Sequence, residues 1–203
     1  MVTLTFPWGA YKIHSRLETS SADSVEPMPK IALPSDAPHP AALEIDDLLA
    51  QCETRRQRRS GPGGQHRNKV ETAIVLKHRP TGIEGQASER RSQQQNKTAA
   101  IRRLRINLAI EARRAADSER TPSLLWNSRC RNGRISVSPR HDDYPAILAE
   151  ALDVLFDEEA ETSAAAKRLA CTASQLVKLV KSEPRAWTLL NEHRSCRGLP
   201  PLK

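Results

Sequence analysis

The segment Ser60–Lys69 holds the residues best suited to chemistry; its sequence is Ser-Gly-Pro-Gly-Gly-Gln-His-Arg-Asn-Lys. Its three glycines allow backbone angles closed to other residues and let a partner approach the main chain closely. Gln65 offers one side-chain acceptor, two side-chain donors and a backbone N–H. Because its amide does not titrate, Gln65 cannot serve as a general base. Any hydrolysis by this segment must depend on seating a water molecule and stabilising developing negative charge.

The positive charge of the chain is concentrated around this segment. Residues 41–140 carry 21 basic and 10 acidic side chains, whereas residues 1–40 and 141–203 are each slightly acidic. Most of the basic residues are arginines, which bind phosphate in a bidentate manner and stack on bases. The pattern favours a nucleic-acid partner. A solvated basic surface with no partner is the alternative.

Apolar periodicity around the glycines predicts a small α+β layer, a short mixed sheet with one long helix, over residues 41–120. We expect a helix over Ala41–Cys52, strands within Thr72–Arg79 and Ile83–Ala87, and a long helix from Ser88 to Ala116. The apolar stripe of that helix consists of Ile101, Leu104, Leu108 and Ala112. Propensity alone does not assign the arginine-rich stretch Glu53–Ser60.

The two ends of the chain differ from this basic middle. Residues 1–40 hold six of the fourteen prolines and predict a flexible leader. A cleavable organelle presequence is an alternative that the four acidic residues of this segment disfavour. Residues 121–203 predict an all-α C-terminal extension. It opens with an irregular stretch, Thr121–Arg140, in which an Asn132-Gly133 turn joins two short strands.

Four helices are expected in this extension. The first begins at Asp143, the second covers Ser163–Ala170, the third follows the capping box Thr172–Gln175, and the fourth begins at Pro184. The second and third resemble a helix-turn-helix unit, but Lys178 and Lys181 are the only basic residues of the third helix. We therefore favour a docking role for this tail over DNA binding.

Four pieces of the sequence, in this order, resemble the GGQ domain of class I peptide chain release factors and of the stand-alone ribosome-rescue hydrolases. They are Ser60–Lys69, the apolar strand Ala73–Leu76, the turn Pro80–Ile83, and Arg91–Lys97 at the start of a helix. The resemblance covers about a third of the chain. It implies a small α+β domain whose glycine-rich segment reaches the peptidyl transferase centre of the ribosome.

The resemblance also implies roles for individual residues. Gly63 and Gly64 would permit the required backbone. The Gln65 backbone N–H would stabilise the tetrahedral intermediate and the departing ribose oxygen, while its side chain would help to seat the water. Asn68, Lys69, Arg91 and Asn96 would orient the segment or touch ribosomal RNA. The full set of expected RNA-binding residues is Arg55, Arg56, Arg58, Arg59, Arg67, Asn68, Lys69, Arg90, Arg91, Asn96, Lys97 and Arg102.

Departures from the family narrow the expected function. We expect the stretch before the GGQ region to be too short for a codon-reading domain. The stand-alone rescue hydrolases end in a disordered, strongly basic tail, whereas the residues after 141 are slightly acidic and are expected to be folded. We expect codon-independent hydrolysis of peptidyl-tRNA on stalled ribosomes. The alternative is a non-catalytic ribosome- or RNA-binding protein of the same fold, which has no need of an intact Gly-Gly-Gln tip.

Other kinds of site are not expected. The four cysteines form no C-x-x-C pair, and the six histidines are scattered, so no metal site and no cofactor are predicted. No apolar run is long enough for a membrane span, and no signal-peptide pattern is present. The expected protein is a cytoplasmic monomer whose partners are peptidyl-tRNA and the RNA of the large ribosomal subunit, with no membrane and no DNA.

Overall fold

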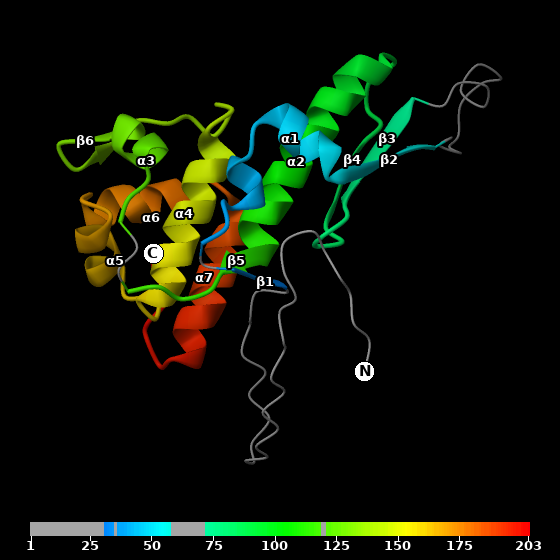
Figure 1. The fold of residues 1–203 in the computed structure, drawn as a ribbon. Coiled ribbons are helices and arrows are strands. Elements are labelled where there is room, and N and C mark those ends of the chain that lie inside the picture. Colours follow the sequence, from blue (N-terminus) through cyan, green and yellow to red (C-terminus); the bar gives the residue numbers. More distant parts are fainter. Residues whose placement is uncertain (1–30, 35, 58–71, 119–120) are drawn as a thin grey trace, which may run out of the picture.

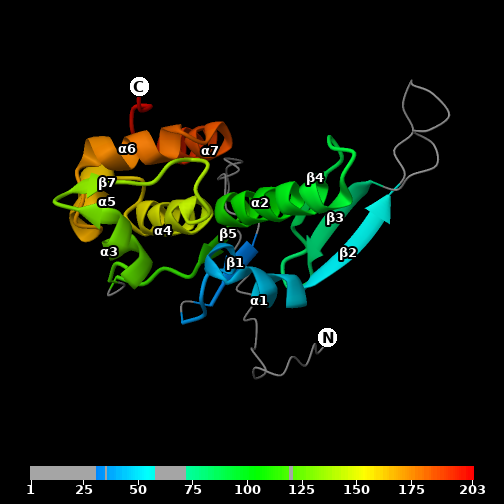
Figure 2. The same cartoon turned by 90° about the horizontal axis from the view of Figure 1, so that it is seen from above.

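A computed structural model describes residues 31–34, 36–57, 72–118 and 121–203 (Figure 1). The long helix α2 (Gln93–Glu111) lies between two regions: a three-stranded sheet on one side and a set of helices on the other. The view from above shows the same order of sheet, α2 and helices (Figure 2). The chain therefore has the α+β organisation with a helical C-terminal region that the sequence predicts.

The sheet is antiparallel, with strand order β2-β3-β4. Its central strand β3 (Ala73–His78) is the predicted apolar strand, and β4 (Glu84–Ala87) follows it after the Thr81-Gly82 turn. The edge strand β2 (Cys52–Gln57) occupies the arginine-rich stretch that propensity left unassigned. Its six residues pair in register with the whole of β3, so pairing with an apolar neighbour, rather than intrinsic propensity, makes this stretch a strand.

Helix α2 packs on the face of the sheet that carries Ile74, Leu76 and Ala87. Close approach requires glycine at position 85, because a Cβ atom there would lie 2.4 Å from the Leu104 nitrogen and 2.5 Å from the Ala100 carbonyl oxygen. Leu104 and Leu108 of the predicted stripe are fully buried.

The bounds of α2 differ from the sequence expectation of Ser88–Ala116. Ser92 caps the helix by accepting a hydrogen bond from the Gln95 N–H, so the first turn starts later than predicted. At the other end the chain leaves the helix at Ala112 and forms β5 (Ala112–Arg114), which pairs in parallel with β1 (Ile31–Leu33). Helix propensity continues through this stretch, and the strand pairing overrides it.

Strand β1 lies in the segment predicted to be a flexible leader, and the expectation is wrong for residues 31–33 and 39–40. His39 and Pro40 are buried, and His39 Nε2 lies 3.1 Å from the Ala112 carbonyl oxygen. The predicted helix Ala41–Cys52 divides into a 3₁₀ turn, η1 (Pro40–Ala42), and a short α1 (Ile45–Ala50) in which Leu48 is buried.

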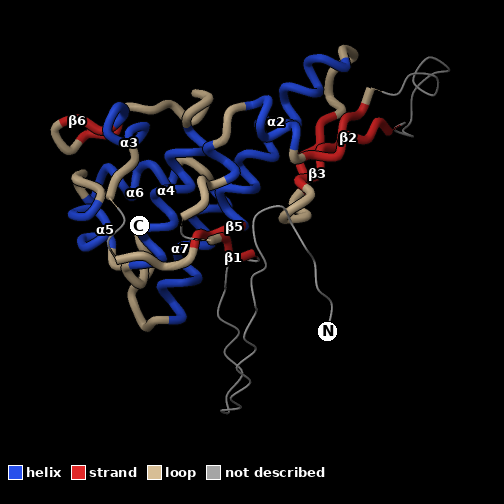
Figure 3. Tube along the Cα trace, viewed as in Figure 1, coloured by secondary structure: helices blue, strands red, loops and turns tan. Residues whose placement is uncertain are grey.

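The helical region contains the four predicted helices (Figure 3). They are α4 (Tyr144–Asp157), α5 (Thr162–Arg168), α6 (Ala173–Lys181) and α7 (Pro184–Cys196). Thr172 caps α6 by accepting from the Gln175 N–H, as the capping box predicts. Leu176, Leu179 and Val180 are buried, as expected.

The stretch Thr121–Arg140 is more regular than expected. It contains the short helix α3 (Leu124–Arg129), capped by Ser123, with Trp126 buried against the helical region. A six-residue helix is too short to show apolar periodicity in the sequence. The predicted Asn132-Gly133 turn is present and joins β6 (Cys130–Arg131) to β7 (Arg134–Ile135).

Candidate nucleic-acid interface

The Gly-Gly-Gln residues belong to the segment that connects β2 to β3. Eight predicted site residues lie outside the described part of the chain: Arg58, Arg59, Gly63, Gly64, Gln65, Arg67, Asn68 and Lys69. The structure does define both ends from which this segment starts. Gln57 ends β2, Ala73 begins β3, and the two are register partners (Figure 1). The segment therefore leaves and re-enters the sheet at one point.

Asn96, in the first turn of α2, holds the β3 end of this connection. Its Nδ2 donates to the carbonyl oxygens of Thr72, at 2.6 Å, and of Arg90, at 2.8 Å. Its Oδ1 accepts from the Arg90 N–H at 2.9 Å. The side chain is fully buried, so it is not exposed to an RNA partner. Of the two roles expected for Asn96, orienting the segment or touching RNA, its burial favours the first.

The contacts of Asn96 also bring two predicted RNA-binding residues beside the start of β3. Arg90 and Arg91 immediately precede the Ser92 cap, and both are exposed. Because Asn96 bonds Thr72 and the Arg90 main chain at once, these two arginines lie next to the strand that follows the glycine segment. The positive end of the α2 dipole adds to their charge. This corner of the molecule is suited to an anionic partner.

Arg55 and Arg56 of β2 are both exposed, but they belong to opposite faces of the sheet because side chains alternate along a strand. Arg55 lies beside Val75, on the face turned away from α2, and donates to both carboxylate oxygens of Glu53, at 2.8 and 3.1 Å. The hydrogen bond from Arg55 lowers the pKa of Glu53. Arg56 pairs with Ile74 on the α2 side.

Lys97 and Arg102 belong to a different surface feature. Both line a groove between α1 and α2 that also includes Ile45, Leu49 and Asp142. The Arg102 guanidinium donates to the carbonyl oxygens of Arg140, at 3.0 Å, and of Pro139. Arg102 thus ties α2 to the chain preceding α4, and the structure does not group it with the glycine segment.

His78 holds the opposite end of the hairpin and was not singled out by sequence reasoning. Its ring nitrogens lie 2.7 Å from Thr81 Oγ1 and 3.0 Å from Gln51 Oε1. Because an amide oxygen only accepts, Nε2 carries the proton and Nδ1 accepts from the Thr81 hydroxyl. Burial lowers the pKa of His78 to about 4, so the ring is neutral at neutral pH. The sequence feature that could have identified this role is a histidine two residues before the turn Pro80-Thr81-Gly82.

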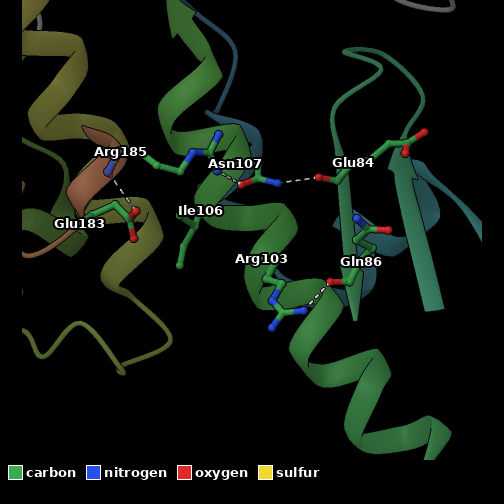
Figure 4. A pocket seen from close by; sticks show the side chains of 7 residues that line it. All are labelled: Glu84, Gln86, Arg103, Ile106, Asn107, Glu183 and Arg185. Atoms are coloured by element: carbon green, nitrogen blue, oxygen red, sulfur yellow. Dashed lines mark hydrogen bonds between the residues drawn. The ribbon is translucent and has the colours of Figure 1, made fainter. Parts of the chain in front are cut away.

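Polar contacts fix the sheet to α2 and α2 to α7 along one groove (Figure 4). Asn107 donates to the Glu84 carbonyl oxygen at 2.6 Å, and Arg103 donates to that of Gln86 at 2.7 Å. From the other side, Arg185 donates to Asn107 Oδ1 at 2.5 Å and to Glu111 at 2.8 Å. These contacts position the sheet relative to the helical region.

Residues 42–144 match the RF-1 domain, and the chain belongs to this family. It is similar to peptide chain release factor 1 of Rickettsia typhi, with 31% identity over 123 residues, which cover 61% of this chain and 34% of that protein. It is also similar to peptide chain release factor 1 of Rhodospirillum rubrum, with 37% identity over 83 residues, covering 40% and 23%. The chain thus spans about a third or less of these relatives. No solved structure matches it.

Two further findings concern the described residues alone. None of the helices there is long and apolar enough to cross a membrane. In the same ranges, no three His, Cys, Asp or Glu side chains come together in a way that could hold a metal ion.

Proposed function

We propose that the chain hydrolyses the ester of peptidyl-tRNA on stalled ribosomes without reading a codon. The observation that carries the proposal is the sequence Gly63-Gly64-Gln65, placed on the β2–β3 connection of a chain that belongs to the RF-1 domain family. The printed names of its relatives, peptide chain release factor 1, support a role in releasing peptides. A module that only binds RNA would have no use for this tip.

The chemistry assigned to the tip needs no titrating side chain. Water attacks the carbonyl carbon of the ester, the tRNA ribose oxygen departs, and a proton passes to that oxygen. The backbone N–H of Gln65 stabilises the negative charge that develops on oxygen in the transition state. The Gln65 side chain seats the water, and the exposed Arg90 and Arg91 bind ribosomal RNA beside the tip.

The remaining parts of the proposal follow from this chemistry. The partner is the ribosome carrying peptidyl-tRNA, and the reaction requires no cofactor. We propose that the chain acts as a monomer in the cytoplasm. Its helical region, which packs on α2 beyond the RF-1 match, serves as a docking unit.

The test is release of labelled peptide from ribosome complexes whose mRNA channel is empty or truncated. Wild type is compared with Gly64→Ala and Gln65→Ala, and Gln86→Ala serves as a matched control because Gln86 is an exposed glutamine of β4. We expect release by wild type and by Gln86→Ala. Gly64→Ala should lower release by at least about a hundredfold, as for removal of an oxyanion donor, because the added Cβ restricts the backbone that places the Gln65 N–H. Gln65→Ala keeps this backbone N–H and should show a smaller loss, from the missing side chain that seats the water.

Two other results would change the assignment. Equal release from ribosomes with a sense codon in an intact message would remove the restriction to stalled complexes. Tight, salt-sensitive ribosome binding with no release, on whole ribosomes and on split large subunits, would favour the non-catalytic RNA-binding alternative.

A further inference from the structure

The β6–β7 hairpin forms a second arginine-lined groove, far from strands β2 and β3. The groove has a volume of about 370 Å³ and is lined by Ser128, Arg129, Arg131, Arg134 and Ser136. Among the residues that the structure describes, no acidic side chain lines it. In both Figure 1 and Figure 2, this hairpin and the β2–β3 sheet lie at opposite ends of the molecule. The groove is therefore separate from the candidate interface described above.

Two uncompensated positive charges face each other across this hairpin. Arg131 and Arg134 are register partners on either side of the Asn132-Gly133 turn, and both are exposed. Like charges directly opposite each other destabilise a strand pair. Within the described ranges, neither side chain has a hydrogen bond or an ion pair. Arg129, in contrast, is neutralised by Asp143, with N–O distances of 2.6 and 2.7 Å.

The frame that carries these two arginines is fixed by hydrogen bonds. The turn residues have φ values of 52° and 74°, which the sequence Asn-Gly accommodates. The Gly133 carbonyl oxygen accepts from the Thr172 N–H at 3.1 Å, which ties the turn to the start of α6. Behind the hairpin, the buried Trp126 donates from its indole N–H to the Leu169 carbonyl oxygen at 2.8 Å. Rigid placement lowers the entropy cost of binding a ligand.

We propose that this groove binds the phosphodiester backbone of RNA, as a contact separate from that of the glycine segment. Guanidinium groups match phosphate with two parallel hydrogen bonds. Two neighbouring arginines suit a strand of successive phosphates better than a single anion. In this part of the chain the positive charge is concentrated in the hairpin, since residues 141–203, which include helices α4 to α7, carry 8 basic and 10 acidic side chains. The exposed Ser136 adds a hydroxyl at the rim of the groove.

The test is binding of the full chain to a fluorescent single-stranded oligouridylate at several KCl concentrations. The informative variant is Arg131→Glu, because it places a carboxylate opposite Arg134 and so removes the repulsion within the hairpin. Its melting temperature should equal or exceed that of wild type. The matched control is Lys203→Glu, which makes the same change of charge at an exposed residue outside the groove.

We expect Arg131→Glu to weaken binding by about tenfold. It should also flatten the slope of log K against log[KCl] by about 1.4, because it removes the phosphate contact of Arg131 and neutralises Arg134, and each lost contact contributes about 0.7 for a single strand. Lys203→Glu should change affinity by less than about twofold, because salt screens an exposed charge that does not touch the RNA. The measurement involves neither tRNA nor peptide, so it stands whether or not the chain releases peptides.

Four results would overturn the inference. The first is unchanged affinity and slope in Arg131→Glu. The second is an equal loss in Lys203→Glu, which would indicate a general effect of net charge. The third is a loss of binding to large ribosomal subunits with full retention of oligouridylate binding, which would indicate that the groove contacts a protein. Displacement of the RNA by millimolar inorganic phosphate would also contradict recognition of a strand.

Discussion

The two regions that pack on α2 are buried to very different extents. In the sheet region, β2 is exposed from Glu53 to Gln57 and only β3 is largely buried. In the helical region, α4 is buried at every position from Tyr144 to Leu155. Burial of apolar area is the main source of stability. The comparison indicates that the helical region contributes most of the stability, while the less buried sheet region carries the β2–β3 connection on which the proposed function depends.

The buried polar contacts of the two regions also differ, in whether the side chains that make them are neutral or charged. The buried polar side chains beside the sheet, Asn96 and His78, make neutral hydrogen bonds. The junction between β5 and α4 contains a buried carboxylate, Asp153, that pairs with Arg113 at 3.0 Å and with Arg114 at 2.7 Å. A change in the helical region should therefore destabilise the whole chain, whereas a change in the sheet region should affect activity more than stability.

The largest effect is expected for Asp153→Ala. The substitution leaves the buried Arg113, whose pKa burial already lowers to about 10, without its counter-charge. Breaking a buried pair on one side costs about 3–5 kcal/mol. Urea denaturation of the full chain measures this, with the exposed Asp142→Ala as a control. A loss below about 1 kcal/mol would show that the junction is not the stabilising contact inferred here.

Acid should weaken the junction through His39. Burial lowers the pKa of His39 to about 4, below its ordinary value of 6.5. Between these values the unfolded chain binds more protons than the folded one, so the free energy of unfolding falls as pH falls. The stabilising contribution of His39 is complete above pH 6.5 and is lost as the pH falls to 4. His39 should account for about 2 kcal/mol between pH 7.5 and pH 5.

The measurement for His39 is the free energy of unfolding at a series of pH values. His39→Gln should reduce the pH dependence by that amount and leave the contribution of His78, whose pKa is also lowered to about 4. An unchanged pH profile in His39→Gln would mean that the ring is not held neutral by burial.

Asn96→Ala should affect peptide release more strongly than it affects the free energy of unfolding. It removes three hydrogen bonds that hold Thr72 and the Arg90 main chain, at an expected cost of about 1–3 kcal/mol. Misplacement of the glycine segment should lower peptide release by about a hundredfold. Gln95→Ala, at an exposed neighbouring position, is the control for both assays. Normal release by a folded Asn96→Ala protein would contradict the positioning role.

The smallest effect is expected for Arg185→Ala in the groove of Figure 4. The Arg185 side chain is 52% exposed and pairs with Glu111 at 2.8 Å. Exposed ion pairs contribute about 0.2–1 kcal/mol. The same urea measurement should therefore show a loss in this range. A loss above about 2 kcal/mol would mean that the packing of α7 depends on this one contact. Exposed contacts would then contribute to stability nearly as much as the buried contacts of the helical region.

Much of the local structure followed from the sequence. The apolar run Ala73–Leu76 predicted β3, and the Thr172 capping box and Pro184 predicted the starts of α6 and α7. The Asn132-Gly133 turn was also predicted. In each case the cause is local: a short run of side chains or a particular backbone angle favours one conformation. The chemical proposal, too, depends on residue types in the Ser60–Lys69 segment.

Other features were decided only by tertiary structure. The polar stretch at Cys52–Gln57 is a strand because β3 pairs with it, and the helix after Gln93 ends at Glu111 because the next residues pair with β1. Asn96 is polar and follows two arginines closely, and the sequence suggested an exposed RNA contact. It is buried because its side chain bonds the main chains of Thr72 and Arg90. Spacing along the chain specifies which residues are polar and where helices can start. Only packing between distant segments determines which of those polar groups are exposed to a partner and which satisfy one another inside the fold.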